Sequence, residues 1–309
     1  MILTLTINPA IDRNVTADRL VFEDRAYLLS ETHSAGGRGI NASSVLNSFG
    51  MPTLAVFPSG GETGRLLEEF LAQTAFPVEV VPIRNPIRTN LTITDRQGLT
   101  VKLNSPGPEL GPEELDGLER AVRRHLPGAS WLLLCGSLPP RVPADFYRRL
   151  MAAAHEHQVR TLVDSDGDVL ADALEGGPTT VAPNQQEAER LLNKALITRA
   201  HFQRAADRIQ AMGARSVLLT LGGRGAVCAH EGRLYDVVPP RIEVKCPIGA
   251  GDAMNAAFVW AWTRNGDFAD AARWGVAAGT ASARLPGLAF PTLDQTREIY
   301  DQVEVRPVR

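Results

Sequence analysis

The chain has 309 residues, a net charge of −3, 44% hydrophobic and 22% charged residues, which is typical of a soluble globular protein and gives no electrostatic case for nucleic acid as a partner. Three widely spaced cysteines argue against a disulfide framework or a zinc site and favour a reducing compartment. Because no run approaches the ~20 apolar residues of a membrane span and the start lacks a signal-peptide pattern, we expect a cytoplasmic protein with no membrane partner.

Strand-like and helix-like patterns alternate along most of the sequence. Nearly all-apolar strands, separated by helices of about 10 to 15 residues, indicate βαβ units and a parallel sheet covered on both faces. Strands are expected at 2–7, 53–57, 130–135, 160–164, 179–184, 216–222, 225–229 and 234–238, and helices at 40–50, 64–74, 144–157, 186–192, 253–262, 268–285 and 293–303.

Two regions interrupt this alternation. Residues 12–34 and 88–104 show short alternating strands that are too polar for a central parallel sheet. We expect them to form a small separate sheet that serves as a lid over a cleft, within a single domain spanning 1–309.

The stretch CPIGAGDAMNAAF places glycines and an aspartate at the start of a helical pattern. Gly249, Ala250 and Gly251 can direct several N–H groups at one anion. Asp252 follows in the first turn, where it would accept a proton from an attacking hydroxyl group. Without further context, the stretch favours the interpretation that Asp252 caps the helix.

A second glycine-rich turn, SAGGRGINASSVL, also leads into a helix. Gly37, Gly39 and Ala42 satisfy a loose dinucleotide-binding pattern, although a polar stretch separates them from the first strand. The preferred interpretation is a polar ligand close to the glycine backbone, with Arg38 and Asn41 as donors. A plain flexible turn is the remaining alternative.

Two further stretches carry possible ligands. Asn184 and Glu187 share a helix face, and their oxygens suit a hydrated magnesium ion. Taken alone, the pair favours a helix cap, with Asn184 as the cap and Glu187 at the third helical position. The glycine turn that follows Thr220 would give a flat base access to the backbone. A Walker A pattern is absent from the sequence, which excludes an ordinary P-loop.

In this order, the stretches closely resemble the phosphofructokinase B family of sugar kinases, which have the ribokinase-like fold. The resemblance covers essentially the whole chain and implies a three-layer α/β fold, with a central mostly parallel sheet flanked by helices and a small β-sheet lid. TINPAID and NSPGP resemble the branch with 1-phosphofructokinase, tagatose-6-phosphate kinase and the minor 6-phosphofructokinase. The motifs are NPAID, AGGRGIN, RTNLTIT, GSLPP, VDSDG, APNQQE, TLGGRGA and IGAGDAM.

The resemblance also implies roles for individual residues. Asp252 would be the catalytic base, and the amides of Gly249, Ala250 and Gly251 would form the anion hole. Arg25 and Arg88 would bind the phosphate that the substrate already carries. A homodimer through the lid sheet is implied as well. The implied substrate-binding residues are Asp12, Arg25, Gly36, Gly37, Arg38, Asn41, Arg88 and Ser137; the nucleotide-binding residues are Thr220, Gly222, Gly225 and Thr280; and Asn184 and Glu187 would hold Mg²⁺ through water.

The sequence departs from the family pattern at four positions. Arg38 stands where the 1-phosphofructokinase branch has lysine, and Ala182 where KPN is usual, which removes a cation. Pro247 replaces the threonine of TVGAGD, removing a hydroxyl and an N–H group. Arg141 adds a charge after GSLPP, where glycine is common. These changes bear on nucleotide affinity, phosphate donor and sugar.

The resemblance implies ATP-dependent phosphorylation of a ketohexose monophosphate, with fructose 1-phosphate giving fructose 1,6-bisphosphate as the first choice. Tagatose 6-phosphate and fructose 6-phosphate are the next candidates. A kinase of an unphosphorylated sugar or nucleoside is a further alternative, which the cations at Arg25, Arg38 and Arg88 disfavour. A catalytically weak sugar-phosphate sensor and a dinucleotide-dependent dehydrogenase are the alternatives from other classes.

Overall fold

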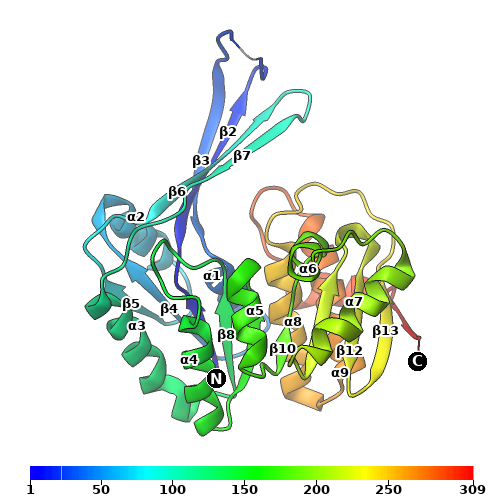
Figure 1. The fold of residues 1–309 in the computed structure, drawn as a ribbon. Coiled ribbons are helices and arrows are strands. Elements are labelled where there is room, and N and C mark those ends of the chain that lie inside the picture. The colour runs from blue at the N-terminus through cyan, green and yellow to red at the C-terminus, as the bar shows by residue number, and fades with distance from the viewer. Residues whose placement is uncertain (22, 309) are drawn as a thin grey trace.

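The computed structural model describes residues 1–21 and 23–308, and Figure 1 shows a layered body from which a small sheet projects. In this part of the chain, ten strands form the central sheet. They are β1 (Ile2–Thr6), β4 (Thr53–Ser59), β5 (Val78–Pro82), β8 (Trp131–Cys135), β9 (Arg160–Asp164), β10 (Thr180–Val181), β11 (Ser216–Thr220), β12 (Ala226–His230), β13 (Arg233–Val238) and β14 (Glu304–Pro307).

The strand order across the central sheet is β14-β13-β12-β11-β10-β9-β8-β1-β4-β5. From β11 to β5 each strand is parallel to its neighbour, whereas β12, β13 and β14 extend the sheet in antiparallel pairs. The predicted mostly parallel sheet is therefore confirmed, with an antiparallel edge. The strands β5 and β14 were not predicted.

Helices cover both faces of this sheet, as three layers require. Successive residues of a strand point to opposite faces: Leu132 and Leu134 of β8 pack in one core cluster, and Trp131 and Leu133 in the other. The first cluster includes residues of α2 (Gly61–Leu71), α3 (Pro112–His125), α4 (Phe146–Glu156), α5 (Gly167–Glu175), α6 (Gln185–Leu192) and α7 (Arg199–Ala211); the second includes residues of α1 (Arg38–Ser48), α8 (Ala250–Asn265), α9 (Phe268–Ala283) and α10 (Leu293–Tyr300). No helix of the described residues is long and apolar enough to cross a membrane.

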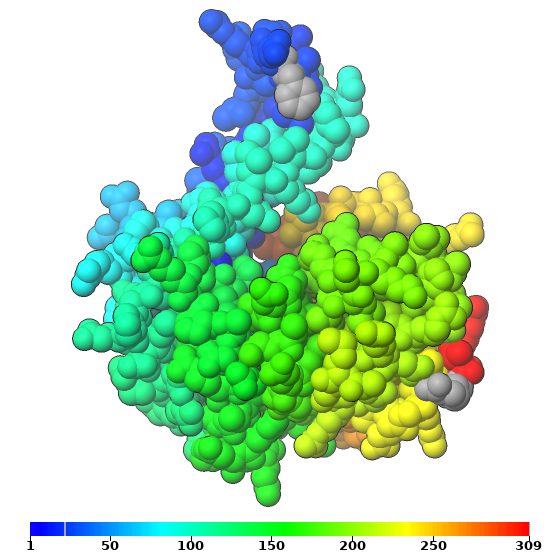
Figure 2. Space-filling view, viewed as in Figure 1, coloured from blue at the N-terminus to red at the C-terminus, as the bar shows by residue number. Residues whose placement is uncertain are grey.

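The projecting small sheet confirms the predicted second sheet. Within the described residues, its four strands have the order β3-β2-β6-β7, with β2 parallel to β6 and the outer pairs antiparallel. Figure 2 shows that this sheet overhangs the body, with a hollow beneath it. Its strands are β2 (Ala10–Ala17), β3 (Leu28–Gly36), β6 (Arg88–Asp95) and β7 (Thr100–Asn104).

Candidate active site

The first turn of α8 is the start of the site. The helix begins after Gly249, whose φ of 79° is left-handed. A Cβ atom at this position would also lie 2.9 Å from side-chain atoms of Leu288 and Phe290, so both the backbone angle and the space require glycine. The N–H groups of the first turn have no carbonyl partner inside the helix and lie at the positive end of its dipole. This turn can therefore receive an anion beside Asp252.

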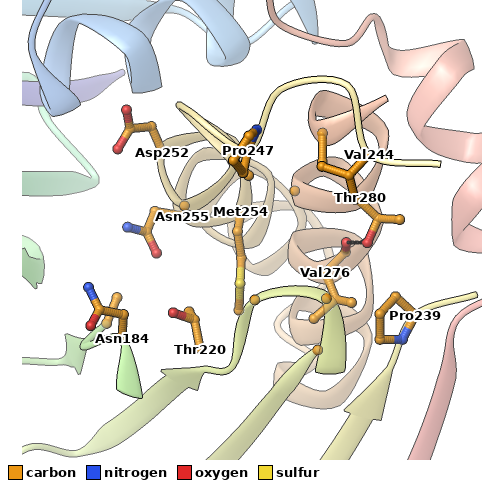
Figure 3. A pocket seen from close by; sticks show the side chains of 18 of the residues that line it. Asn184, Thr220, Pro239, Val244, Pro247, Asp252, Met254, Asn255, Val276 and Thr280 are labelled. Atoms are coloured by element: carbon orange, nitrogen blue, oxygen red, sulfur yellow. Dashed lines mark hydrogen bonds between the residues drawn. The ribbon is translucent and has the colours of Figure 1, made fainter. Parts of the chain in front are cut away.

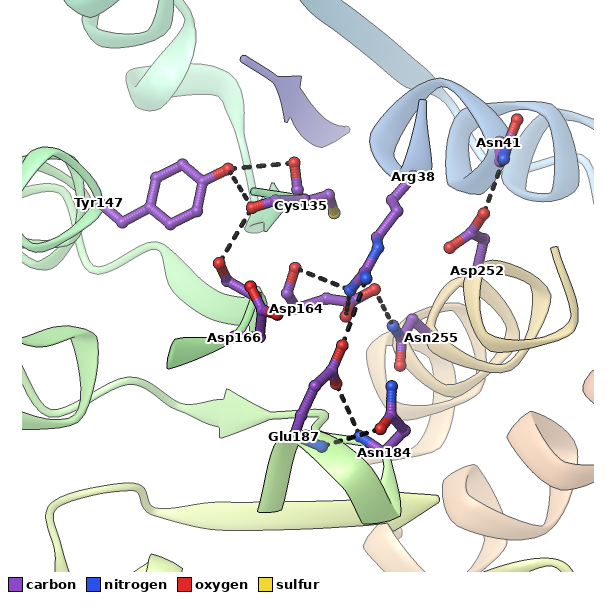
Figure 4. A network of polar contacts seen from close by, with 12 residues as sticks. Arg38, Asn41, Cys135, Tyr147, Asp164, Asp166, Asn184, Glu187, Asp252 and Asn255 are labelled. Carbon is purple, nitrogen blue, oxygen red and sulfur yellow. Dashed lines mark hydrogen bonds and ion pairs between the residues drawn. The ribbon is translucent and has the colours of Figure 1, made fainter. Parts of the chain in front are cut away.

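Asp252 directs its carboxylate toward α1 and does not cap its own helix. Asn41 Nδ2 donates a hydrogen bond of 2.7 Å to Asp252 Oδ2 (Figure 4). Burial, and after it the charge of Asp164, raise the pKa of Asp252 to about 7, although Asn41 and Arg38 oppose the shift. A carboxylate with a pKa near neutrality is a stronger base than a solvated aspartate. Asp252 is therefore suited to remove a proton from a hydroxyl group.

A polar network beside Asp252 joins three parts of the fold through Arg38, as Figure 4 shows. From the start of α1, its guanidinium donates to Asp164 Oδ1 at 2.5 Å and to Glu187 Oε1 at 3.3 Å. Asp164, at the end of β9, also accepts a 3.1 Å hydrogen bond from Asn255 Nδ2. Both carboxylates are buried, and the pKa of Arg38 is raised, chiefly by the charge of Asp164. The network thus fixes a cation next to the candidate base.

Asn184 and Glu187, the expected magnesium pair, also form the cap of α6. Asn184 Oδ1 accepts from the Glu187 N–H at 3.0 Å, and Glu187 Oε2 accepts from the Asn184 N–H at 2.8 Å. The two interpretations are compatible, because each carboxylate oxygen of Glu187 keeps a second lone pair that can accept from a metal-bound water, and both residues line the large cavity. Among the described residues, no three His, Cys, Asp or Glu side chains gather to hold a metal ion. A mostly hydrated ion such as Mg²⁺ fits this arrangement.

The large cavity has a volume of about 630 Å³ and extends from Asp252 toward α9 (Figure 3). All four residues expected to contact a nucleotide line it. Its far end carries apolar side chains that suit a flat base, and the end near Asp252 carries the charged network. Ala182 and Pro247 line the cavity without a charge or a hydroxyl. The expected residues are Thr220, Gly222, Gly225 and Thr280, and the apolar side chains at the far end are Pro239, Val244 and Val276.

A small cavity of about 200 Å³ lies against the small sheet. Cys246 and Ile248 line it, whereas Pro247 between them lines the large cavity. Asp12 lines the small cavity and accepts a 2.9 Å hydrogen bond from Asn90 Nδ2. Gly36 leaves room for this carboxylate, since a Cβ there would lie 2.5 Å from Asp12 Oδ2. Burial raises the pKa of Asp12. Lys102 lines the same cavity, which therefore offers hydrogen-bonding groups and a cation together.

The remaining predicted residues lie at different distances from this centre. The Arg88 guanidinium donates to two backbone carbonyls, at 3.0 and 3.1 Å, which anchors it at the base of the small sheet. Gly37 precedes α1, and Ser137 lies in the loop after β8. Arg141 pairs with an exposed glutamate. Arg25 lies on the exposed loop between β2 and β3 and lines neither cavity. Within a single chain, it is therefore not gathered with the other predicted site residues.

Sequence reasoning did not assign Asp164, Asn255 or Lys102 to the site. Asp164 could have been found, because it stands in the VDSDG motif at the C-terminal end of a parallel strand, where ligands bind in open α/β sheets. Asn255 is three residues after Asp252 and shares its helix face. Lys102 alternates with apolar neighbours in a polar strand, and the sequence does not show which face meets a cavity.

Residues 5–295 match the model of the pfkB family carbohydrate kinases. The chain belongs to this family. ATP-dependent 6-phosphofructokinase isozyme 2 of Escherichia coli K12 is 33% identical over 302 residues, with 97% of each chain covered. The 1-phosphofructokinase of Rhodobacter capsulatus is 31% identical, with 99% of this chain and 97% of that one covered.

The fold agrees with this assignment. The crystal structure of phosphofructokinase-2 from Escherichia coli in complex with potassium matches with a TM-score of 0.90 and 32% identity, covering 97% of this chain and 98% of that chain. The predicted family and ribokinase-like fold are confirmed, and the protein is a carbohydrate kinase. The dehydrogenase that the glycine pattern left open belongs to a different class and is set aside.

Proposed function

We propose that this pfkB kinase transfers the γ-phosphoryl group of ATP to a ketohexose monophosphate, with fructose 1-phosphate as the first candidate. The observation that carries the proposal is the place of Asp252, a buried carboxylate with a pKa of about 7 in the first turn of α8. Asp252 lines the large cavity, and Cys246 and Ile248, shortly before it in the chain, line the small one. A hydroxyl from the small cavity and a phosphate from the large one would meet at this turn.

The residues around this turn have separate tasks in the proposed reaction. Asp252 takes the proton of the sugar hydroxyl, whose oxygen attacks the γ-phosphorus in line while the bond to the β-phosphate oxygen breaks. Asn41 orients the carboxylate through its 2.7 Å hydrogen bond. The amides of Gly249–Gly251 stabilise the charge on the transferring group. A magnesium ion, held through water by Asn184 and Glu187, would neutralise part of the phosphate charge.

Cations around the small cavity support a substrate that is already phosphorylated. Lys102 lines this cavity, and Arg88 is anchored near it at the base of the small sheet. Ammonium and guanidinium groups both bind phosphate oxygens well. Fructose 6-phosphate is the second candidate, because the Escherichia coli relative at 33% identity is named a 6-phosphofructokinase and its phosphofructokinase-2 has been solved with fructose-6-phosphate. Tagatose 6-phosphate is the third.

The test is ADP release from a panel of fructose 1-phosphate, fructose 6-phosphate, tagatose 6-phosphate, unphosphorylated sugars and nucleosides, with ATP and GTP as donors. Phosphorus NMR of the products identifies the hydroxyl that reacts. We expect turnover with a ketohexose monophosphate and ATP. Turnover of unphosphorylated acceptors alone would move the function to that alternative, and no turnover at all would refute the kinase proposal and leave the sensor.

We also propose that the small sheet closes over the small cavity as a lid and pairs with a second copy of the chain as a homodimer. Alternate side chains of β7 divide between its faces: Lys102 and Asn104 line the cavity, so Val101 and Leu103 point to the opposite face. There they are exposed, 39% and 54% respectively. An apolar face on a projecting sheet is the kind of surface that a second subunit covers. Other exposed apolar residues of this sheet and its loops are Val21, Tyr27, Leu28, Leu29 and Leu99.

A further inference from the structure

Arg38 bridges two carboxylates from different elements, Asp164 at the C-terminal end of β9 and Glu187 in α6. Its Nη1 lies 2.5 Å from Asp164 Oδ1 and its Nη2 lies 3.3 Å from Glu187 Oε1. The side chains of Asp164 and Glu187 are 8% and 3% exposed, so each needs a positive partner in place of water. Among the described residues, Arg241 is the only other cationic side chain that lines the large cavity. The structure shows no bond between Arg241 and either carboxylate.

A second observation marks the same place as a ligand site. Asn255 lines the large cavity and is 3% exposed, and its Nδ2 donates to Asp164 Oδ2. Its Oδ1 is buried and has no hydrogen-bond partner among the described residues. An unpaired amide oxygen next to two carboxylates forms an oxygen set that a hard divalent cation prefers. A guanidinium group satisfies the carboxylates but leaves this oxygen unpaired.

We propose that Arg38 is the resident counter-ion of Asp164 and Glu187, and that it competes with the divalent cation for this carboxylate pair. The inference rests on the proposed function, in which a metal–nucleotide enters the large cavity. A guanidinium and a divalent cation repel each other, and both would bind the same carboxylate oxygens. Binding of the metal–nucleotide therefore releases Arg38, which lies at the start of α1 near Asn41 and is then free to pair with phosphate oxygens.

The experiment measures Mn²⁺ binding by electron paramagnetic resonance, with Mn²⁺ alone and with Mn²⁺ plus ATP. Arg38→Met removes the competing charge, so Mn²⁺ alone should bind at least about tenfold more tightly than to the wild type. Arg38→Lys keeps one charge but cannot reach both carboxylates as a fork does, and its affinity should lie between the two. Arg190→Met is the matched control, because Arg190 lies on the same helix as Glu187 but pairs with the exposed Asp166, at 3.1 Å.

A purely structural clamp gives a different result. It predicts that Arg38→Met unfolds at lower urea concentration and that Mn²⁺ neither binds more tightly nor restores the midpoint. The competition model predicts a lower midpoint that Mn²⁺ reverses; if Arg38→Met does not fold, Arg38→Lys carries the same comparison. Equal Mn²⁺ affinities in all variants, or a gain in affinity in Arg190→Met equal to that in Arg38→Met, overturn the competition. In either case, binding of Mn²⁺ together with ATP leaves the proposed function intact. Absence of Mn²⁺ binding with and without ATP overturns both.

Discussion

The substitution Asp252→Asn separates the chemistry of the site from its stability. It removes the candidate base but retains an oxygen that can accept the hydrogen bond from Asn41 Nδ2. We expect the rate of phosphoryl transfer to fall by about 10²- to 10⁴-fold, which is the typical contribution of a general base. We also expect the protein to become more stable at every pH above about 4, because the cost of keeping an ionisable carboxylate buried is removed.

The size of the stability gain follows from the pKa. The pKa of Asp252 rises from 3.8 in the unfolded chain to about 7 in the fold, so folding favours the protonated form. The ionised carboxylate therefore destabilises the fold by an amount that is absent below about pH 4, grows through the interval and is complete above about pH 7. The rise in pKa from 3.8 to about 7 corresponds to about 4 kcal/mol at about pH 8.5 and to about 2 kcal/mol at about pH 5.

Urea unfolding of both proteins at about pH 5 and about pH 8.5, without ligands, measures this difference. The free energy of unfolding of Asp252→Asn should exceed that of the wild type at both values, and by more at the higher one. Activity of the two proteins at the higher pH gives the loss of catalysis in the same preparations. An equal or lower stability of Asp252→Asn at about pH 8.5 would show that the carboxylate is not held at a raised pKa.

Three further results are expected. In Asn41→Ala, Asp252 loses a hydrogen bond that lowers its pKa, so the acid limb of the kcat/KM profile should move to higher pH; an unmoved limb contradicts this. Lys102→Met should raise KM for the sugar phosphate about tenfold with little change in kcat, as measured in steady-state kinetics; a fall in kcat alone contradicts phosphate binding. Leu103→Asp should convert a dimer to monomers in sedimentation analysis; an unchanged mass removes the proposed interface.

The sequence predicted the central sheet because its parallel strands are short apolar runs between helices, a pattern that local residues determine. It did not predict β14, whose residues EVRP are mostly polar and exposed and which pairs with β13 only. Such an edge strand exists because a neighbour offers free backbone groups, and this information lies elsewhere in the chain. The small sheet was predicted because its alternation of polar and apolar residues is local as well.

The site was predictable where a motif contains its own geometry. The glycines before Asp252 and the cap formed by Asn184 and Glu187 are of this kind. The partners of Arg38 were not predicted: Asp164 is 126 positions away, and no spacing rule links a residue at the start of α1 to the end of β9. The same limit applies to Arg25, whose charge suggested a phosphate site but whose loop lies at the exposed end of the small sheet.

Residue 182, where the family pattern has a lysine and this chain has alanine, lies near the carboxylates that Arg38 binds. The Ala182 N–H donates to the Val163 carbonyl at 3.0 Å, so residue 182 stands beside the strand that ends in Asp164, and it lines the same cavity. Since 39% of the Arg38 side chain is exposed, solvent screens its pairs, and Arg38→Met should cost about 1 to 3 kcal/mol of unfolding free energy.

A second cation placed at residue 182 should compensate for that loss. The flexible four-carbon stem of a lysine can carry an ammonium toward Asp164 or Glu187. Ala182→Lys should therefore restore about half or more of the stability lost in Arg38→Met, yet give little or no gain in the wild type, where it would meet the guanidinium of Arg38. Urea unfolding of the four proteins completes the cycle. If the effects of the two substitutions on the free energy of unfolding are additive, a cation at residue 182 does not interact with the carboxylates that Arg38 binds. Arg38 would then not stand in for the cation that is missing at residue 182.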